Sequence, residues 1–258
     1  MVILIHSSKT MQSLANNKAH YQKPRYIKEA TQLQKYLSAL PTSAYIKDMK
    51  LSANLADKTK QLVNSWSYSP NDQTPAAECF LGDIYSGLQF NKLTDEEKQW
   101  ANEHLFIISG LYGILRPLDS IFPYRLELGY RLSPYGNNNL YTFWGDKLAK
   151  LIPKNENIIN LTSVEYGRAI MPYLSDIVVQ PTFLTKNIKL NKYVSVAVHS
   201  KIARGAMAHW LIVSKKENIK KFKELGYIYN NELSEPNKPV FVTERFLGLG
   251  LSVRLKNK

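Results

Sequence analysis

Glycines, prolines and charged side chains are concentrated between residues 105 and 132, at a density that an ordinary core segment does not need. Gly110 and Gly113 allow tight turns or a close approach to a ligand, because no Cβ is in the way. Pro117 and Pro123 fix φ at the next two corners. The polar side chains of this segment are Arg116, Asp119, Tyr124, Arg125 and Glu127. We therefore expect a preorganised site on a shaped loop, in which the acids pair with neighbouring arginines.

Groups that could carry acid–base or nucleophilic chemistry lie near predicted loops and element ends, both in this segment and elsewhere in the chain. The candidate catalytic residues are Lys9, Asp83, Asp119, Glu165 and Lys201. Carboxylates can act as general acids or bases, and a lysine can act as a nucleophile or a phosphate ligand. We expect them in one cleft with Tyr85, Tyr124 and three arginines. Convergence of these groups in a closed pocket favours an enzyme, whereas a flat basic face favours a binding protein.

A second pattern suggests contact with a phosphate backbone. Residues 94–97 read as a capping box that starts a helix, and this helix, a turn at residues 109–113 and a short second helix resemble a helix-hairpin-helix unit over 94–118. Such units bind phosphates through hairpin amides. The two glycines are three apart instead of the usual two, and a tight turn between packed helices explains the same pattern. The candidate DNA-binding or phosphate-binding residues are Ser109, Gly110, Leu111, Tyr112, Gly113, Arg116, Tyr124, Arg125, Arg204 and Gly205.

Apolar periodicity predicts the elements that position these groups. Expected strands span 2–6, 158–161, 177–184, 192–199, 226–229 and 240–245, and expected helices lie within 25–66, 75–87, 94–108, 140–151, 203–213 and 215–223. We predict a mixed α/β (α+β) fold with a central mixed sheet flanked by helices. A helical lobe at about 25–118 contains the helix-hairpin-helix-like element. The whole chain, 1–258, is expected to form a single domain, because no linker, repeat or low-complexity run divides it.

Two polar segments follow predicted buried strands, where ligand crevices form in open α/β sheets. Residues 162–166 follow the strand at 158–161 and are expected at such a crevice. Residues 6–10 follow the first strand, and their hydroxyls are better explained as caps of a turn. Lys9 is the exception, because its ammonium group could meet an anion.

Composition limits the classes of protein and partner. The formal net charge is +13 and the pI is about 9.6, which suits phosphate-rich partners such as duplex DNA. A single cysteine excludes an internal disulfide, and no apolar run is long enough to span a membrane. We expect a cytoplasmic protein without a cofactor, and a monomer is compatible with the sequence. No metal site is expected, because the five histidines show no ligand spacing; they are His6, His20, His104, His199 and His209.

The chain resembles the YaaA family of bacterial peroxide stress proteins. Several of its sequence stretches are similar to stretches of that family and follow one another in the same order. They are GDIYSGLQ at 82–89, SGLYGILRPLD at 109–119, PYRLELG at 123–129, FWGDKL at 143–148, INLTSVEY at 159–166 and KIARG at 201–205. The family's usual Ser-Pro-Ala-Lys is replaced at residues 6–9, so only Lys9 carries over. The resemblance implies a cytosolic factor that limits free iron and oxidative DNA damage, with a helix-hairpin-helix element and a basic cleft.

Three functions remain open on the sequence. The first is binding of duplex DNA with little sequence preference, through the phosphate backbone. The second is an enzyme that acts on nucleic acid or a nucleotide through the lysines and carboxylates. The third, direct iron binding, lacks the clustered histidines and carboxylates that iron sites favour.

Overall fold

The computed structural model describes residues 1–14, 22–66, 73–133, 136, 139–174 and 177–251. Its central sheet has five strands in the order β6-β5-β1-β8-β9. The strands are β1 (Val2–His6), β5 (Leu105–Ser109), β6 (Gly113–Leu115), β8 (Ile158–Asn160) and β9 (Val178–Val179). β1, β5, β8 and β9 run parallel, and β6 pairs antiparallel with β5. All residues of β1 and β5 are buried, as expected for apolar strands covered on both faces.

The register of the central sheet brings two chain segments together. Ile3 pairs with Leu105 of β5 and with Ile159 of β8, so the three strands end at the same edge. The loop after β1 and the loop after β8 leave the sheet at this edge. Polar residues that follow parallel strands therefore meet there.

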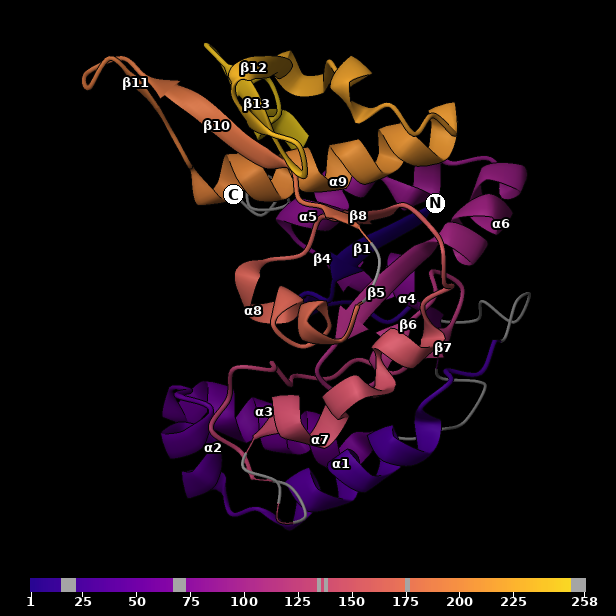
Figure 1. Ribbon diagram of the computed structural model, residues 1–258. Helices are drawn as coiled ribbons and strands as arrows, with labels where there is room; N and C mark the ends of the chain where they lie inside the picture. The colour runs from indigo at the N-terminus through magenta and orange to yellow at the C-terminus, as the bar shows by residue number, and fades with distance from the viewer. Residues whose placement is uncertain (15–21, 67–72, 134–135, 137–138, 175–176, 252–258) are drawn as a thin grey trace.

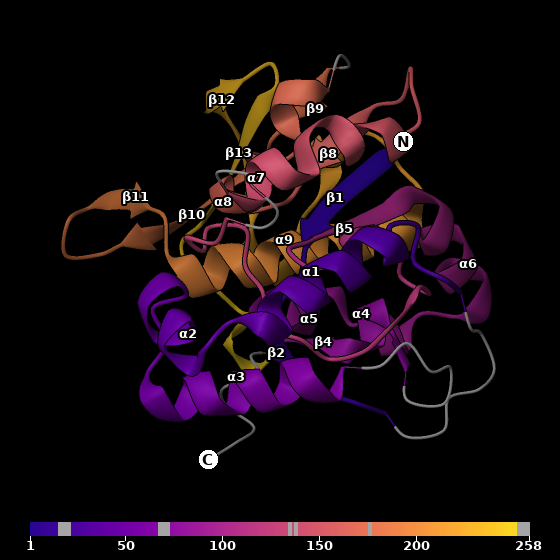
Figure 2. The same ribbon diagram turned by 90° about the horizontal axis from the view of Figure 1, so that it is seen from below.

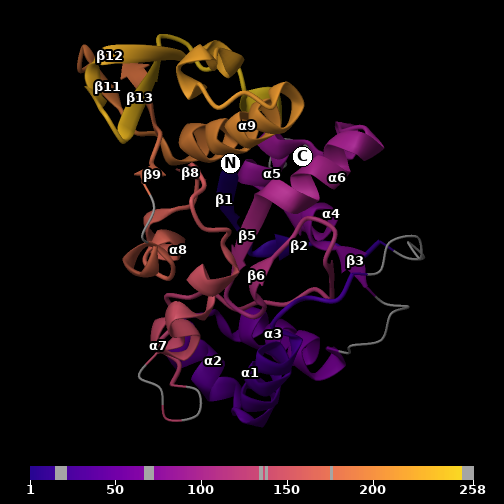
Figure 3. The ribbon, with the colours of Figure 1, turned by 45° about the vertical axis from the view of Figure 1, so that its right-hand side comes forward.

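A second sheet has four strands in the order β11-β10-β13-β12. These strands are β10 (Thr182–Asn187), β11 (Lys192–Val194), β12 (Ile228–Glu235) and β13 (Lys238–Thr243). The long helix α9 (Ala197–Ser214) lies between this sheet and the rest of the molecule, as Figure 1 shows. Figure 3 shows the same layers from a second direction.

Helix α9 packs closely on α5 (Asp83–Leu88). Two glycines make this possible: a Cβ added at Gly87 would meet the backbone of Ile202, and a Cβ added at Gly205 would meet the backbone of Ile84. The close contact fixes the first residues of α5 beside the first turns of α9.

Three helices cover the opposite end of the molecule, the end that Figure 2 turns toward the viewer. They are α1 (Ile27–Ala39), α2 (Thr42–Asp48) and α3 (Ala53–Ser65). The remaining helices are α4 (Ala76–Cys79), α6 (Asp95–His104), α7 (Leu140–Trp144) and α8 (Val164–Gly167), and short 3₁₀ turns span 90–92, 145–147, 149–151, 171–173, 219–221, 224–226 and 249–251. Two further ladders join β2 (Thr10–Met11) to β4 (Phe80–Leu81) and β3 (Thr74–Pro75) to β7 (Ser120–Ile121).

The predicted fold class is confirmed: mixed sheets are flanked by helices in an α+β arrangement. The predicted capping box is also present at the start of α6, where Thr94 and Glu97 each accept the other's backbone N–H. It fixes the helix start, because two N–H groups that would otherwise lack partners are satisfied.

The prediction of a helix-hairpin-helix unit over residues 94–118 is wrong. Helix α6 ends at His104, and the chain continues as the antiparallel β5–β6 hairpin. Within the expected helical lobe only residues up to 65 form α1–α3, whereas β5 and β6 belong to the central sheet. The physical reason is pairing: the apolar run 105–109 is buried on both faces beside β1, which favours a strand.

Other expected elements also differ. The expected strand 177–184 is split at Pro181 between two sheets, because proline cannot continue a ladder. The expected strand 192–199 stops at Val194, and α9 begins at Ala197. No helix spans the lysine-rich residues 215–223, since Lys215 adopts φ +53° and ends α9.

Two glycines with positive φ interrupt expected helices. Gly82, at φ +109°, separates α4 from α5, so Asp83 is the first residue of a helix. The helix expected over 140–151 ends at Trp144, because Gly145 adopts φ +49°.

Candidate functional site

A pocket of about 440 Å³ lies at the carboxyl ends of β1 and β8. Its walls come from residues 6–10 after β1, residues 82–84 at the start of α5, Glu127, residues 163, 165 and 166 after β8, and Lys201 of α9. Lysines and carboxylates both line it, so we call it the mixed-charge pocket. Four of the five predicted catalytic residues, Lys9, Asp83, Glu165 and Lys201, meet there.

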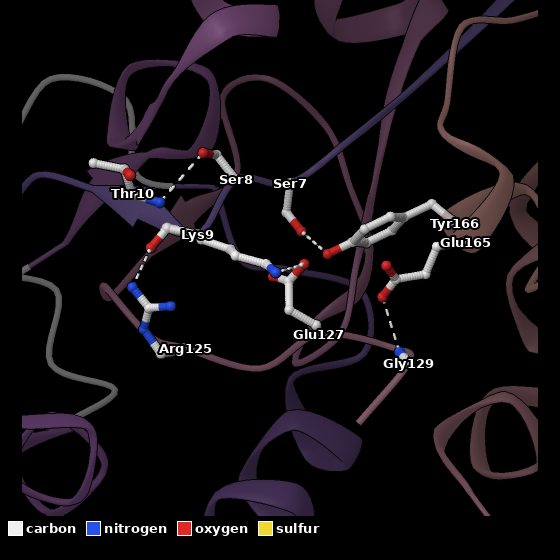
Figure 4. Close-up of polar contacts among 9 residues, drawn as sticks. All are labelled: Ser7, Ser8, Lys9, Thr10, Arg125, Glu127, Gly129, Glu165 and Tyr166. Carbon is white, nitrogen blue, oxygen red and sulfur yellow. Dashed lines mark hydrogen bonds and ion pairs between the residues drawn. The ribbon is translucent and has the colours of Figure 1, made fainter. Parts of the chain in front are cut away.

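Glu127 is a buried carboxylate of this pocket, with 7% of its surface exposed. The Nζ atom of Lys9 lies 3.9 Å from its Oε2 atom, and Figure 4 shows the lysine side chain extended toward it. Burial raises the pKa of Glu127, and the nearby charge of Glu165 raises it as well, whereas Lys9 lowers it. Glu127 therefore holds a proton at higher pH than an exposed glutamate does.

A hydrogen-bonded chain leads from the first loop to this carboxylate. The hydroxyl of Ser7 donates to the Tyr166 hydroxyl oxygen over 3.1 Å, and Tyr166 in turn hydrogen-bonds Glu127. Burial raises the pKa of Tyr166 well above its usual value, so the phenol stays protonated. Ser7, Tyr166 and Glu127 thus form one polar unit in the wall of the pocket.

His6 is buried and neutral. Its ring stacks on Tyr166 with centroids 4.8 Å apart, and its Nδ1 atom accepts the backbone N–H of Ser163. Burial lowers the pKa of His6 to about 3, with further contributions from the positive charges of Arg204 and Lys201. The imidazole therefore joins the loops after β1 and β8 without carrying charge.

Glu165 and Asp83 complete the acidic side of the pocket. The Oε1 atom of Glu165 accepts the backbone N–H of Gly129 over 2.9 Å, which ties the loop after β8 to the loop that carries Glu127 (Figure 4). Asp83 is the first residue of α5, and only 7% of its surface is exposed. Its place follows from the close packing of α5 on α9 described above.

The other predicted catalytic residue, Asp119, lies elsewhere. It lines a separate pocket of about 270 Å³ together with Arg25 and Arg116. Its Oδ2 atom accepts the backbone N–H of Arg116 over 2.8 Å, so the expected side-chain ion pair is replaced by a backbone hydrogen bond. Burial raises the pKa of Asp119 to about 7. Together with the backbone hydrogen bond from Asp119 N–H to the oxygen of Arg116, this side-chain contact closes the turn at residues 116–119.

The second expected ion pair is also absent from the described structure. Arg125 donates from Nη2 to the backbone oxygen of Lys9 over 3.2 Å, whereas Glu127 pairs with the Lys9 side chain (Figure 4). Tyr85 donates its hydroxyl to the backbone oxygen of His6. Arg125 and Tyr85 therefore brace the loop after β1 from outside the mixed-charge pocket.

Residues 109–113, predicted to present amides to phosphate, are buried. The Ser109 hydroxyl accepts the backbone N–H of Tyr112 and lies 2.6 Å from the Tyr124 hydroxyl. The backbone oxygen of Gly110 accepts the indole N–H of Trp144. The groups predicted to contact phosphate in this hairpin, and Tyr124, therefore lie inside the protein and not at its surface. Gly205 is likewise a packing residue against α5.

Four residues of the site are absent from the predicted catalytic and phosphate-binding sets, although residues 162–166 and Glu127 were expected near a ligand: they are His6, Ser7, Glu127 and Tyr166. The signal for His6 and Ser7 is their place directly after a buried strand, a place that also suits residues that cap a turn. Capping does apply to Ser8, whose hydroxyl accepts the backbone N–H of Thr10. Glu127 was paired with the wrong partner, since Lys9 is remote in sequence.

Metal ligands do not cluster in the part of the chain that the structure describes: no group of three histidine, cysteine or acidic side chains is suitably placed. His20 lies outside the described residues. None of the described helices combines the length and apolar character that a membrane span requires.

Known proteins resemble the chain over nearly its full length. A family model described as peroxide stress protein YaaA matches residues 1–233. A UPF0246 protein of Salinispora tropica is 46% identical over 258 residues, which cover 98% of each chain. UPF0246 proteins of Shewanella sp. strain MR-4 and of Clostridium beijerinckii are 36% and 35% identical, and the matches cover 95% of this chain and 99% and 98% of those proteins.

Proposed function

Because the chain belongs to the YaaA family of peroxide stress proteins, we propose that it supports peroxide resistance as an enzyme that acts on nucleic acid or a nucleotide in the mixed-charge pocket. One observation carries the proposal: two lysines and three carboxylates from separate segments of the chain meet around one concave space. Buried carboxylates cost stability and add nothing to the neutralisation of phosphates, so their convergence favours chemistry over simple binding.

Each group has a role that its surroundings support. Lys9 and Lys201 provide positive charge for a phosphate group, and Lys9, with 58% of its side chain exposed, is free to reach a ligand. Glu127 acts as a general acid or base, because burial and the charge of Glu165 raise its pKa above that of an exposed glutamate. Tyr166, whose hydroxyl accepts a hydrogen bond from Ser7, hydrogen-bonds the Glu127 side chain and so positions it.

The test replaces the central carboxylate without changing its shape. Glu127→Gln should abolish peroxide survival in cells that depend on this protein, yet leave the melting temperature and DNA affinity close to wild type. Glu235→Gln is the matched control, because that exposed glutamate also pairs with a lysine, Lys238, at 2.9 Å. Full protection by Glu127→Gln, together with full protection by Asp83→Asn and Glu165→Gln, would remove the support for an enzyme.

A second candidate is DNA binding with little sequence preference, which would limit oxidative DNA damage and free iron without catalysis. The β10–β11 hairpin favours it, because this arm projects from the body of the protein in Figure 1. Lys189 and Lys192 are exposed on it, and so are Ile188 (86%) and Leu190 (58%) at its tip. Lysines that alternate with exposed apolar residues suit a duplex, since the charges meet phosphates while the apolar groups enter a groove.

Removal of two charges from the arm tests this candidate. The double variant Lys189→Gln, Lys192→Gln should weaken binding to duplex DNA and reduce the slope of log affinity against log salt by about two. The control removes the same charge from an exposed surface away from the arm, in Lys221→Gln, Lys223→Gln. Equal losses in the two double variants would show that only net charge matters, and affinity that is insensitive to salt would exclude a phosphate contact.

A further inference from the structure

A second pocket adjoins the mixed-charge pocket and differs from it in charge. It has a volume of about 410 Å³ and shares Ser163 with its neighbour. Arg168 and Arg204 line it together with Thr162 and Gln180, and we call it the arginine pocket. None of the residues that line it is acidic. Two guanidinium groups and several neutral polar groups therefore surround one space.

Arg204 is the unusual member of this pocket. It lies half buried within α9, and no hydrogen bond or ion pair joins its guanidinium to another described residue. Burial lowers the pKa of Arg204, and no neighbouring carboxylate offsets that effect. Charges taken out of water are normally paired, because an unpaired charge loses its solvation without compensation. A guanidinium retained in this state has its planar set of donors available for an anion.

The pKa of His6, which lies nearby, is affected by the same positive charges. His6 lies against Ser163, the residue common to both pockets; burial lowers the pKa of its ring, and the charges of Arg204 and Lys201 lower it further. The field that disfavours a proton on His6 favours an anion at the same place. The unpaired guanidinium therefore points to a missing negative charge, and the low pKa of His6 is in part a consequence of that same guanidinium.

We propose that the arginine pocket binds a phosphate group, either as inorganic phosphate or as part of a nucleotide. Arginine forms paired hydrogen bonds with phosphate oxygens, and Arg168 at the exposed rim can supply the second charge. The hydroxyl of Ser163 lies between the two pockets and can contact the same group. The proposal requires binding only, so it holds whether or not the mixed-charge pocket performs chemistry.

Calorimetric titration of the full-length protein at low salt tests the proposal with two probes, inorganic phosphate and adenosine monophosphate. Arg204→Gln should weaken binding by roughly tenfold or more, because it removes a charge-assisted hydrogen-bond pair. Arg168→Gln should weaken it less, and this exposed side chain can be changed without harm to the fold. Arg131→Gln, at an exposed arginine that does not line the pocket, should leave binding unchanged.

A second readout follows the His6 ring by NMR. Addition of either probe should raise the pKa of His6 in the wild type, because a bound anion offsets the charge of Arg204, and Arg204→Gln should abolish this response. Binding of both probes with similar affinity identifies the phosphate group alone as the ligand, and binding of the nucleotide alone identifies a nucleotide. Loss of binding in Lys9→Gln but not in the arginine variants would place the anion in the mixed-charge pocket and overturn the proposal, as would no binding of either probe.

Discussion

The β5–β6 hairpin and the mixed-charge pocket both contain serines, tyrosines and nearby carboxylates, but the two regions place them in different surroundings. In the hairpin, residues 109–113 are buried, and their polar atoms bond to one another or to other protein groups such as Tyr124 and Trp144. In the mixed-charge pocket, Lys9 and Glu127 face a space of about 440 Å³. The same residue types therefore maintain the fold in one region and are available to a ligand in the other. Substitutions should accordingly change stability in the hairpin and ligand chemistry in the pocket.

The largest expected effect is at Gly110. A Cβ at this position would meet the backbone oxygen and carbon of Leu126, and neither can move as a side chain can. Gly110→Ala should lower the free energy of unfolding by about 4 kcal/mol or more, measured by chemical denaturation. Were this variant as stable as the wild type, the hairpin would not be the rigid structural region described here.

Comparison of Gly113 with Gly145 separates the free-energy cost of a steric clash from the cost of a strained backbone conformation. It adopts φ +72°, and a Cβ there would lie 2.6 Å from the Trp144 ring. Gly145 also has a positive φ, +49°, but nothing lies within 4 Å of an added Cβ. Gly113→Ala should therefore lose more stability than Gly145→Ala, with total losses of about 3 and about 1–2 kcal/mol respectively in denaturant unfolding. Equal losses would mean that the tryptophan moves away without cost.

The next effect depends on pH and concerns Asp119. Its pKa rises from 3.8 in the unfolded chain to about 7 in the folded protein, so the folded state binds the proton more tightly. Stability should fall as pH rises between these two values, by on the order of 2–3 kcal/mol after allowance for screening by solvent. Asp119→Asn keeps an acceptor for the Arg116 amide and removes the titration. Its stability should therefore vary less with pH over this range, and an unchanged slope in thermal unfolding would contradict the assignment.

Local sequence signals predicted the parts of the fold that local interactions decide. The apolar residues of β1 are enough to predict that strand, and the capping box at Thr94 and Glu97 is enough to predict where α6 begins. The hairpin was different, because two glycines three apart suit a turn between helices as well as a turn between strands. Pairing of β5 with β1 decides between these structures, and that pairing joins distant parts of the chain.

The candidate site, like the fold, could be predicted only where local sequence signals decide the structure. Lys9, Asp83 and Glu165 could be placed together because each follows a strand or begins a helix at one edge of the sheet, and Lys201 joins them from the second turn of α9. Asp119 and Glu127 could not be told apart, since each is an acid close to an arginine in sequence. Only the fold gives Asp119 a backbone amide and Glu127 the side chain of Lys9. The start of α9 was missed because its contact with α5 overrides a strand-like alternation.

The smallest effect on stability is expected within the mixed-charge pocket, where the readout is electrostatic. Lys9→Gln should change the free energy of unfolding by less than about 1 kcal/mol, because its side chain is exposed and its pair with Glu127 is long, at 3.9 Å. The same change should raise the pKa of Glu127, since Lys9 lowers it, whereas Glu165→Gln should reduce that pKa, since the charge of Glu165 raises it. Carboxylate titration followed by NMR, with Glu127→Gln to assign the signal, measures both shifts. Opposite shifts with nearly constant stability would establish that the pocket carboxylates are coupled to one another and to Lys9. Shifts of the same sign, or a large loss of stability, would instead make this pocket a structural region like the hairpin.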